Sequence, residues 1–101
     1  MIDTLKSLGF TEYEAKAYLA LLAESSVTGY AVAKHSGVPR SKIYEVLDNL
    51  VSRGDVIVSP GEPPLYCPLS AKELIQKKKR QTEEQLSRAE AELATMDKTM
   101  R

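Results

Sequence analysis

The feature that most constrains the fold is a four-residue connection, Ser36-Gly37-Val38-Pro39, between two helical patterns. Gly37 can end a helix at positive φ, and Pro39 suits the first turn of the next helix, where its missing N–H is not needed. The first pattern runs from Gly29 to Ser36. In the second, from Arg40 to Arg53, apolar residues recur at positions 43, 46, 47 and 50, which is the spacing of one helix face. The sequence therefore predicts two crossed helices joined by a tight turn.

Helical patterns also precede this pair. A short one covers Ile2 to Leu8, and the sequence Thr11-Glu12-Tyr13-Glu14 has the form of a capping box that opens a second helix. The apolar stripe of this second helix is expected at Ala15, Tyr18, Leu19 and Leu22.

After Gly54 the pattern changes. Val56–Val58 and Leu65–Cys67 are β-prone runs separated by turn-forming residues, which predicts a two-stranded hairpin. Cys67 alternates with Leu65 and is expected to fill the core as a small hydrophobe. A second capping box begins at Ser70, and no proline or glycine follows residue 68, so a helix of about 30 residues, roughly 45 Å long, is expected.

This order of elements predicts a mainly α fold with a small β-hairpin (α+β). We expect a winged helix-turn-helix domain over residues 1–70 and a coiled-coil-like dimerisation helix over residues 71–101. In a helix-turn-helix the second helix can lie in the DNA major groove while the first crosses the backbone.

Composition narrows the class of function. The 101 residues carry 14 basic and 14 acidic side chains, so any DNA-binding surface has to come from local segregation of charge. No apolar stretch is long enough to span a membrane, and the N-terminus does not have the form of a secretory signal. One cysteine and one histidine favour neither an internal disulfide nor a zinc site, and no catalytic constellation is present. We expect a cytoplasmic, non-enzymatic protein with no metal, cofactor or membrane segment.

Candidate DNA contacts lie where the predicted helix pair would meet a duplex. An arginine at the start of a recognition helix can bond guanine O6 and N7, and nearby hydroxyls and cations can bond bases or phosphates. Residues 72–80 hold five cations against one acid and add a second basic segment. The candidates are Tyr30, Lys34, Arg40, Ser41, Lys42, Tyr44, Lys77 and Lys78. The alternative is that these are solvated side chains, that Tyr44 packs under the hairpin and that the basic run is a solvated collar.

The last predicted helix carries an apolar stripe with a seven-residue repeat. A helix of this length cannot bury such a stripe alone, so the stripe predicts a partner. We expect two chains to pair, in parallel or antiparallel, through Leu86, Ala89, Leu93, Met96 and Met100. The alternative is packing of the helix against its own domain.

Three segments together resemble one family. They are residues 8–22 (LGFTEYEAKAYLALL), residues 36–47 (SGVPRSKIYEVL), and Arg53-Gly54 followed by a hairpin with Gly61, Pro63 and Tyr66. As a set, covering about residues 2–70, they are similar to TrmB-like transcriptional regulators. The resemblance implies a DNA-binding transcription regulator, usually dimeric.

Two departures from this family limit what the resemblance implies. Its sugar-sensing members continue past a coiled coil into a larger effector-binding domain, whereas this chain stops at Arg101, so sensing through such a domain is not expected. A basic wing is not expected either, because no Lys or Arg lies between Gly54 and Ala71.

Two hypotheses for function follow. The first is a homodimeric regulator that reads a palindromic operator in double-stranded DNA, with the helix Arg40–Arg53 in the major groove. The second is a winged-helix protein–protein interaction module without direct DNA readout, favoured by the net neutrality and the acidic residue Glu62 in the wing. A partner protein or a separate sensing subunit is compatible with either hypothesis.

Overall fold

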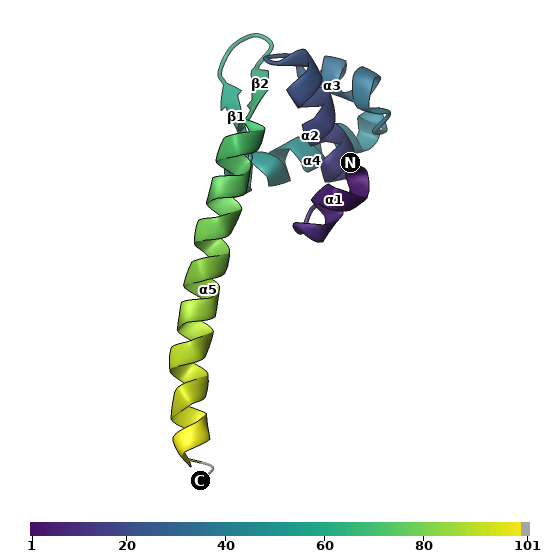
Figure 1. Cartoon of the computed structure of the whole chain (residues 1–101). Coiled ribbons are helices and arrows are strands. Elements are labelled where there is room, and N and C mark those ends of the chain that lie inside the picture. The colour runs from purple at the N-terminus through teal and green to yellow at the C-terminus, as the bar shows by residue number, and fades with distance from the viewer. Residues whose placement is uncertain (100–101) are drawn as a thin grey trace. The chain divides into compact units, whose positions relative to one another are not determined.

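The computed structural model describes residues 1–99, with side chains up to residue 97. Its internal contacts divide the chain into a unit from Met1 to Ala71 and a second unit from Lys72 onward. The elements follow in the order α1 (Ile2–Ser7), α2 (Glu12–Glu24), α3 (Gly29–Ser36), α4 (Arg40–Arg53), β1 (Val56–Ser59), β2 (Leu65–Pro68) and α5 (Ala71–Thr99), as Figure 1 shows.

Short-range hydrogen bonds begin and end the helices of the first unit. At the start of α2 the Thr11 hydroxyl accepts from the Glu14 amide, and the Glu14 carboxylate accepts from the Thr11 amide, so the capping box is confirmed. Thr28 caps α3 in the same way, by accepting from the amide three residues on. Gly37 and Gly54, at φ 79° and 81°, end α3 and α4 in the left-handed region that glycine adopts without strain. The predicted bounds of both helices are confirmed.

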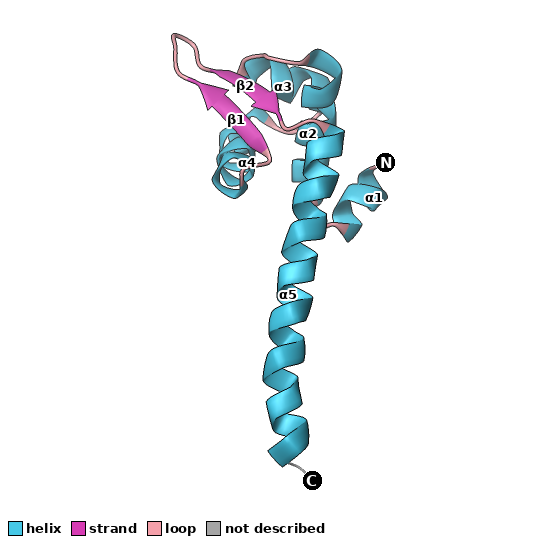
Figure 2. Cartoon of the chain, turned by 60° about the vertical axis from the view of Figure 1, so that its left-hand side comes forward, coloured by secondary structure: helices cyan, strands magenta, loops and turns pink. Residues whose placement is uncertain are grey.

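The hairpin pairs β1 with β2 in antiparallel register, with Val58 opposite Tyr66, and Figure 2 shows the two strands side by side. Tyr66 also exchanges two backbone hydrogen bonds with Val27, at 2.7 and 3.0 Å, which ties β2 to the segment before α3. The prediction that Cys67 fills the core is wrong. Neighbouring strand residues face opposite sides, and the inward side chain is Tyr66, 6% exposed, whereas Leu65 is 39% exposed and Cys67 is half-buried.

The core of the first unit lies among α2, α3, α4 and the hairpin. In α2 the predicted stripe is confirmed at Ala15 and Tyr18 but wrong at Leu22, which is exposed, because Ala17 and Leu21 are the residues that complete the inward face. The Tyr18 hydroxyl donates to the Leu69 carbonyl at 2.7 Å, so its polar end is satisfied although the ring is buried. The core side chains are Leu5, Phe10, Ala15, Ala17, Tyr18, Leu21, Val32, Ala33, Val38, Ile43, Val46, Leu47, Leu50, Val56 and Tyr66.

One charged cluster lies within this unit. Arg53, the last residue of α4, donates from Nη1 to Glu14 Oε1 at 3.0 Å and from Nε to Asp55 Oδ2 at 3.2 Å. The two carboxylates are almost fully buried, at 4% and 0% exposure. The Arg53 guanidinium also lies 5.2 Å from the centre of the Phe10 ring. The cluster therefore connects the start of α2, the end of α4 and the residue before β1.

The second unit consists of α5, a single continuous helix (Figure 1). Nearly all of its described side chains beyond residue 80 are exposed, including Leu86, Leu93 and Met96. The residues predicted to pair two chains are called the seam below: Leu86, Ala89, Leu93, Met96 and Met100. Met100, the last of them, lies outside the described residues. Within the described part of the chain, no helix is long and apolar enough to cross a membrane.

Candidate nucleic-acid interface

The turn between α3 and α4 is fixed by bonds of its own. The Ser36 hydroxyl accepts from the Val38 amide at 3.1 Å, and the Val38 side chain is buried at 3% exposure. The Pro39 carbonyl accepts from the amides of Lys42 and Ile43, at 2.9 and 3.1 Å, which begins α4. The first turn of α4 is thereby held in a defined position next to α3.

Helix α4 presents one apolar side to the core and one polar side to solvent. Ile43, Val46, Leu47 and Leu50 form the buried side. All six candidates predicted on α3 and α4 are exposed: Tyr30, Lys34, Arg40, Ser41, Lys42 and Tyr44. Charge is also graded along the exposed side of α4, because Arg40 and Lys42 lie in the first turn and Glu45 and Asp48 follow. Positive charge thus lies at the end of the helix that contacts base edges in helix-turn-helix proteins.

Arg40 and Tyr30 lie against each other across the turn. The guanidinium carbon of Arg40 is 4.2 Å from the centre of the Tyr30 ring, which is a cation–π contact. Tyr30 is 54% exposed, so the contact forms at the surface and not in the core. The structure therefore brings together two of the predicted site residues, one from each helix of the pair.

Tyr44 packs on the start of α3. A Cβ atom added to Gly29 would lie 2.6 Å from Tyr44 Cε1, far inside van der Waals contact, so the absence of a side chain at Gly29 allows this approach. About half of Tyr44 remains exposed. Tyr44 thus connects α4 to α3 and also contributes to the exposed surface of α4.

The wing, residues 56–68, differs from the helix pair in charge and polarity. It carries no Lys or Arg and one acid, Glu62, while Ile57 and Leu65 are 57% and 39% exposed on it. Burial raises the pKa of the Tyr66 hydroxyl above its ordinary value of 10, and electrostatic interactions with Asp48 and Tyr44 add to the rise. Asp48 and Tyr44 both belong to the exposed side of α4.

The basic charge of the chain is concentrated at the start of the second unit. Residues 1–71 hold six Lys and Arg against eight Asp and Glu, a net charge of −2, whereas residues 72–101 hold eight against six, a net charge of +2. Of the basic run, Lys77 and Lys78 are half-buried, and Lys79 and Arg80 are exposed.

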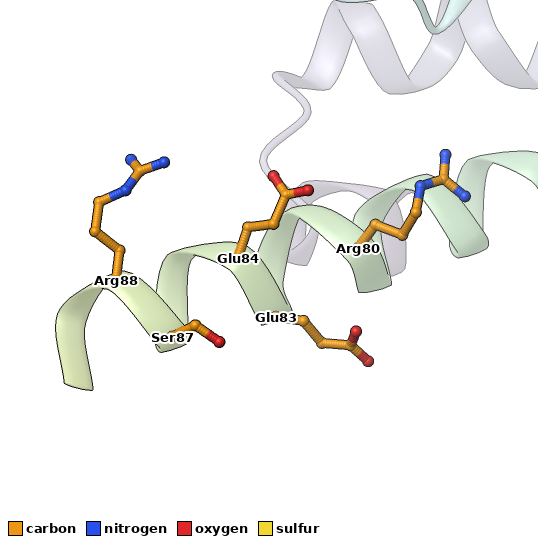
Figure 3. Close-up of a pocket in the computed structure, with 5 residues that line it drawn as sticks. All are labelled: Arg80, Glu83, Glu84, Ser87 and Arg88. Atoms are coloured by element: carbon orange, nitrogen blue, oxygen red, sulfur yellow. The ribbon is translucent and has the colours of Figure 1, made fainter. Parts of the chain in front are cut away.

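The predicted seam lies opposite one ridge of charged residues on α5. At 3.6 residues per turn, Leu86 and Leu93 lie about 180° from the ridge formed by Arg80, Glu84 and Arg88. Figure 3 shows these three side chains on one side of the helix, around a shallow surface hollow that Glu83 and Ser87 also line. All five residues come from one helix, and two of them are basic, two acidic and one neutral, so this hollow is a solvated outer face and not a ligand cavity.

Sequence reasoning missed several contacts. The bond between Arg53 and Glu14 joins residues 39 positions apart, and no local pattern signals such a pair. The stack of Tyr30 on Arg40 also escaped prediction, although both residues were candidates, because it depends on the crossing of α3 and α4. Among the described residues, no group of three or more His, Cys, Asp or Glu side chains is placed to hold a metal ion.

A helix pair joined by a tight turn and followed by a two-stranded wing defines a winged helix-turn-helix domain. The family model described as "Sugar-specific transcriptional regulator TrmB" matches residues 5–72. The chain belongs to the TrmB family of DNA-binding transcription regulators.

Individual relatives agree with this assignment. The chain is 61% identical over 99 residues to the uncharacterized protein YrhO of Bacillus subtilis (strain 168), covering 98% of this chain and 36% of YrhO. It is 36% identical over 77 residues to the sugar sensing transcriptional regulator TrmBL1 of Pyrococcus furiosus, covering 76% of this chain and 23% of TrmBL1. The structure of TrmBL2, an archaeal chromatin protein described as showing a novel mode of DNA binding, superimposes with a TM-score of 0.86 and 28% identity, over 97% of this chain and 40% of TrmBL2. The chain thus spans less than half the length of each.

Proposed function

We propose that the protein is a sequence-specific DNA-binding transcription regulator that acts as a homodimer in the cytoplasm. The observation that supports this most is the exposed, cationic start of α4, where Arg40 lies over Tyr30. Within the described residues the Arg40 guanidinium makes no hydrogen bond or ion pair, so its donors are available to a ligand.

Roles for the individual residues follow from their chemistry and place. Arg40 would bond a guanine through O6 and N7, and Ser41 and Lys42 would bond a neighbouring base or phosphate. The remaining candidates are assigned to phosphate and sugar contacts, which position the protein without reading sequence: Tyr30, Lys34, Tyr44, Lys77 and Lys78.

Homodimerisation is proposed through the exposed apolar side of α5. Leu86 and Leu93 are each 63% exposed and Met96 is 54% exposed, so pairing with a second α5 would remove apolar surface from water. Two paired chains would present two copies of α4 to a palindromic operator whose half-sites are centred about 34 Å apart.

A selection from random duplexes, followed by fluorescence anisotropy on the selected site, tests this proposal. We expect enrichment of one palindromic site, steep weakening of binding with salt, and a loss of about 1 to 3 kcal/mol of discrimination at one base position in Arg40→Ala. Lys16→Ala, which removes a cation from α2, is the matched control and should bind like the wild type. The proposal is wrong if no duplex is enriched and Arg40→Ala changes nothing.

A protein–protein interaction module is the second candidate. Ile57 and Leu65 expose apolar surface on a wing without cations, and the net charge of residues 1–71 is −2. Such a module would bind a partner protein or a sensing subunit and would show no salt-sensitive retention on duplex DNA at low ionic strength, whereas the regulator would.

A further inference from the structure

We infer that Tyr30 is a positioning residue for DNA readout: its ring holds the Arg40 guanidinium in the plane in which that group reads one guanine. The inference rests on the proposed function, in which Arg40 contacts a base. It changes the role of Tyr30 from a phosphate contact to a residue that acts through Arg40.

Tyr30 and Arg40 are in contact across the turn between α3 and α4. Tyr30 is the second residue of α3 and Arg40 is the first residue of α4, so the stack spans the turn between the two helices. The separation of 4.2 Å between the guanidinium carbon and the ring centre is close for a cation–π contact, which extends to about 6 Å. The side chain of Arg40 is therefore ordered by a residue outside its own helix.

An aromatic ring and a guanine use different parts of a guanidinium group. A ring stacked on the guanidinium covers one of its flat faces, while all five N–H donors lie in the plane and point outward. A carboxylate would also order Arg40, but it would consume the donors that a guanine needs. Stacking on Tyr30 fixes the plane and leaves the fork of donors available for two bonds to one base.

The backbone that carries Tyr30 is well supported. The start of α3 is fixed by the cap from Thr28 and by the Tyr44 ring packed on Gly29. The Tyr30 side chain itself is 54% exposed and adds little to the core. Tyr30 thus combines an exposed ring with a fixed backbone, which suits a role in holding Arg40 better than a role in core packing.

A double-mutant cycle tests the inference in the full chain. Tyr30→Leu, Tyr30→Phe, Arg40→Ala and the Tyr30→Leu/Arg40→Ala pair are measured on the selected operator and on a duplex with the guanine read by Arg40 replaced. Loss of a surface cation–π contact predicts a two- to fivefold weaker binding of Tyr30→Leu to the operator, about 0.5 to 1 kcal/mol. The preference for guanine should fall at that position alone. Tyr30→Phe should keep both the operator affinity and the preference for guanine, because the ring remains.

The cycle and a matched control separate this role from other roles of Tyr30. If Tyr30 acts through Arg40, Tyr30→Leu has no further effect when Arg40 is already alanine. Tyr13→Leu, which removes another exposed tyrosine from α2, should behave like the wild type. Thermal unfolding of each variant, followed by circular dichroism, should show all of them folded.

Two outcomes would overturn the inference in different ways. If Tyr30→Leu weakens binding to both duplexes equally, or adds to the effect of Arg40→Ala, Tyr30 contacts DNA itself or only supports the fold. The proposed function then stands without the inference. If Arg40→Ala leaves every base preference unchanged, the inference fails, and if no duplex is enriched either, the proposed function fails with it.

Discussion

Replacing Arg53 by methionine should destabilise the domain strongly, because it leaves two buried carboxylates without their cation. Glu14 is 4% exposed and Asp55 is fully buried, and the Arg53 guanidinium lies 3.0 and 3.2 Å from them. Breaking a buried ion pair from one side costs about 3 to 5 kcal/mol. Because the Arg53 side chain is 36% exposed, solvent screens part of this interaction, and we expect a loss of about 3 kcal/mol.

This loss is large for a small domain. A stability of about 0.05 to 0.15 kcal/mol per residue leaves little margin, and 3 kcal/mol corresponds to a fall in Tm of about 12 to 24 °C. Urea and thermal unfolding followed by circular dichroism measure it. Lys16→Met is the matched control, because Lys16 pairs with Glu12 at 3.7 Å on the surface of α2 and its removal should cost about 0.5 kcal/mol or less.

A triple variant identifies the cause. With Glu14→Gln and Asp55→Asn added to Arg53→Met, the cluster holds no buried charge, and most of the lost stability should return. The electrostatic explanation is refuted if the free energy of unfolding of Arg53→Met lies within about 1 kcal/mol of the wild-type value. It is also refuted if the triple variant is no more stable than Arg53→Met.

Three further predictions concern the seam, the helix pair and the wing. Leu93→Lys should convert a dimer into a monomer in light scattering, because it places a charge in the apolar stripe, whereas Ser87→Lys on the outer face should not. Gly29→Ala should weaken DNA binding by displacing the Tyr44 ring, and the same change should be neutral when Tyr44 is already alanine. The folded protein keeps the Tyr66 proton to higher pH than the unfolded chain does, because the pKa of Tyr66 is raised. Its contribution to stability is therefore intact below pH 10 and is lost as the pH rises through the raised pKa, a loss that Tyr66→Phe should avoid in urea unfolding.

Each of these predictions has a clear contrary result. A Leu93→Lys variant that stays dimeric would place the dimer contact elsewhere. An effect of Gly29→Ala that persists without the Tyr44 ring would come from the backbone and not from the clash. Parallel stability curves for Tyr66→Phe and the wild type above pH 10 would show that Tyr66 titrates alike in both states.

The sequence predicted those parts of the fold that depend on neighbouring residues. The bounds of α3 and α4 were predictable because Gly37 and Gly54 stop helices through their own backbone freedom. The inward face of β2 was not, because either face of a four-residue strand can turn inward, and the choice depends on the bridge between Tyr66 and Val27, far apart in the chain.

The candidate site also has features that the sequence predicted and features that it did not. Exposure of Arg40 and Lys42 followed from the apolar spacing of α4, so the polar side of that helix was predictable. The order imposed on Arg40 by Tyr30 was not, because it requires the distance between two helices. The acidic wing was visible in the sequence, and Ile57 and Leu65 add the exposed apolar surface that only the structure shows.

Replacement of single operator purines by their 7-deaza analogues tests the central claim, that α4 reads bases in the major groove, most directly. The analogue removes the N7 acceptor and leaves Watson–Crick pairing intact. We predict that substitution of one guanine in each half-site weakens binding of the wild type about 5- to 150-fold, as expected for about 1 to 3 kcal/mol. Binding of Arg40→Ala should not change when the same guanine is substituted. Equal binding of the wild type to every substituted operator, or an unchanged sensitivity in Arg40→Ala, would contradict the account.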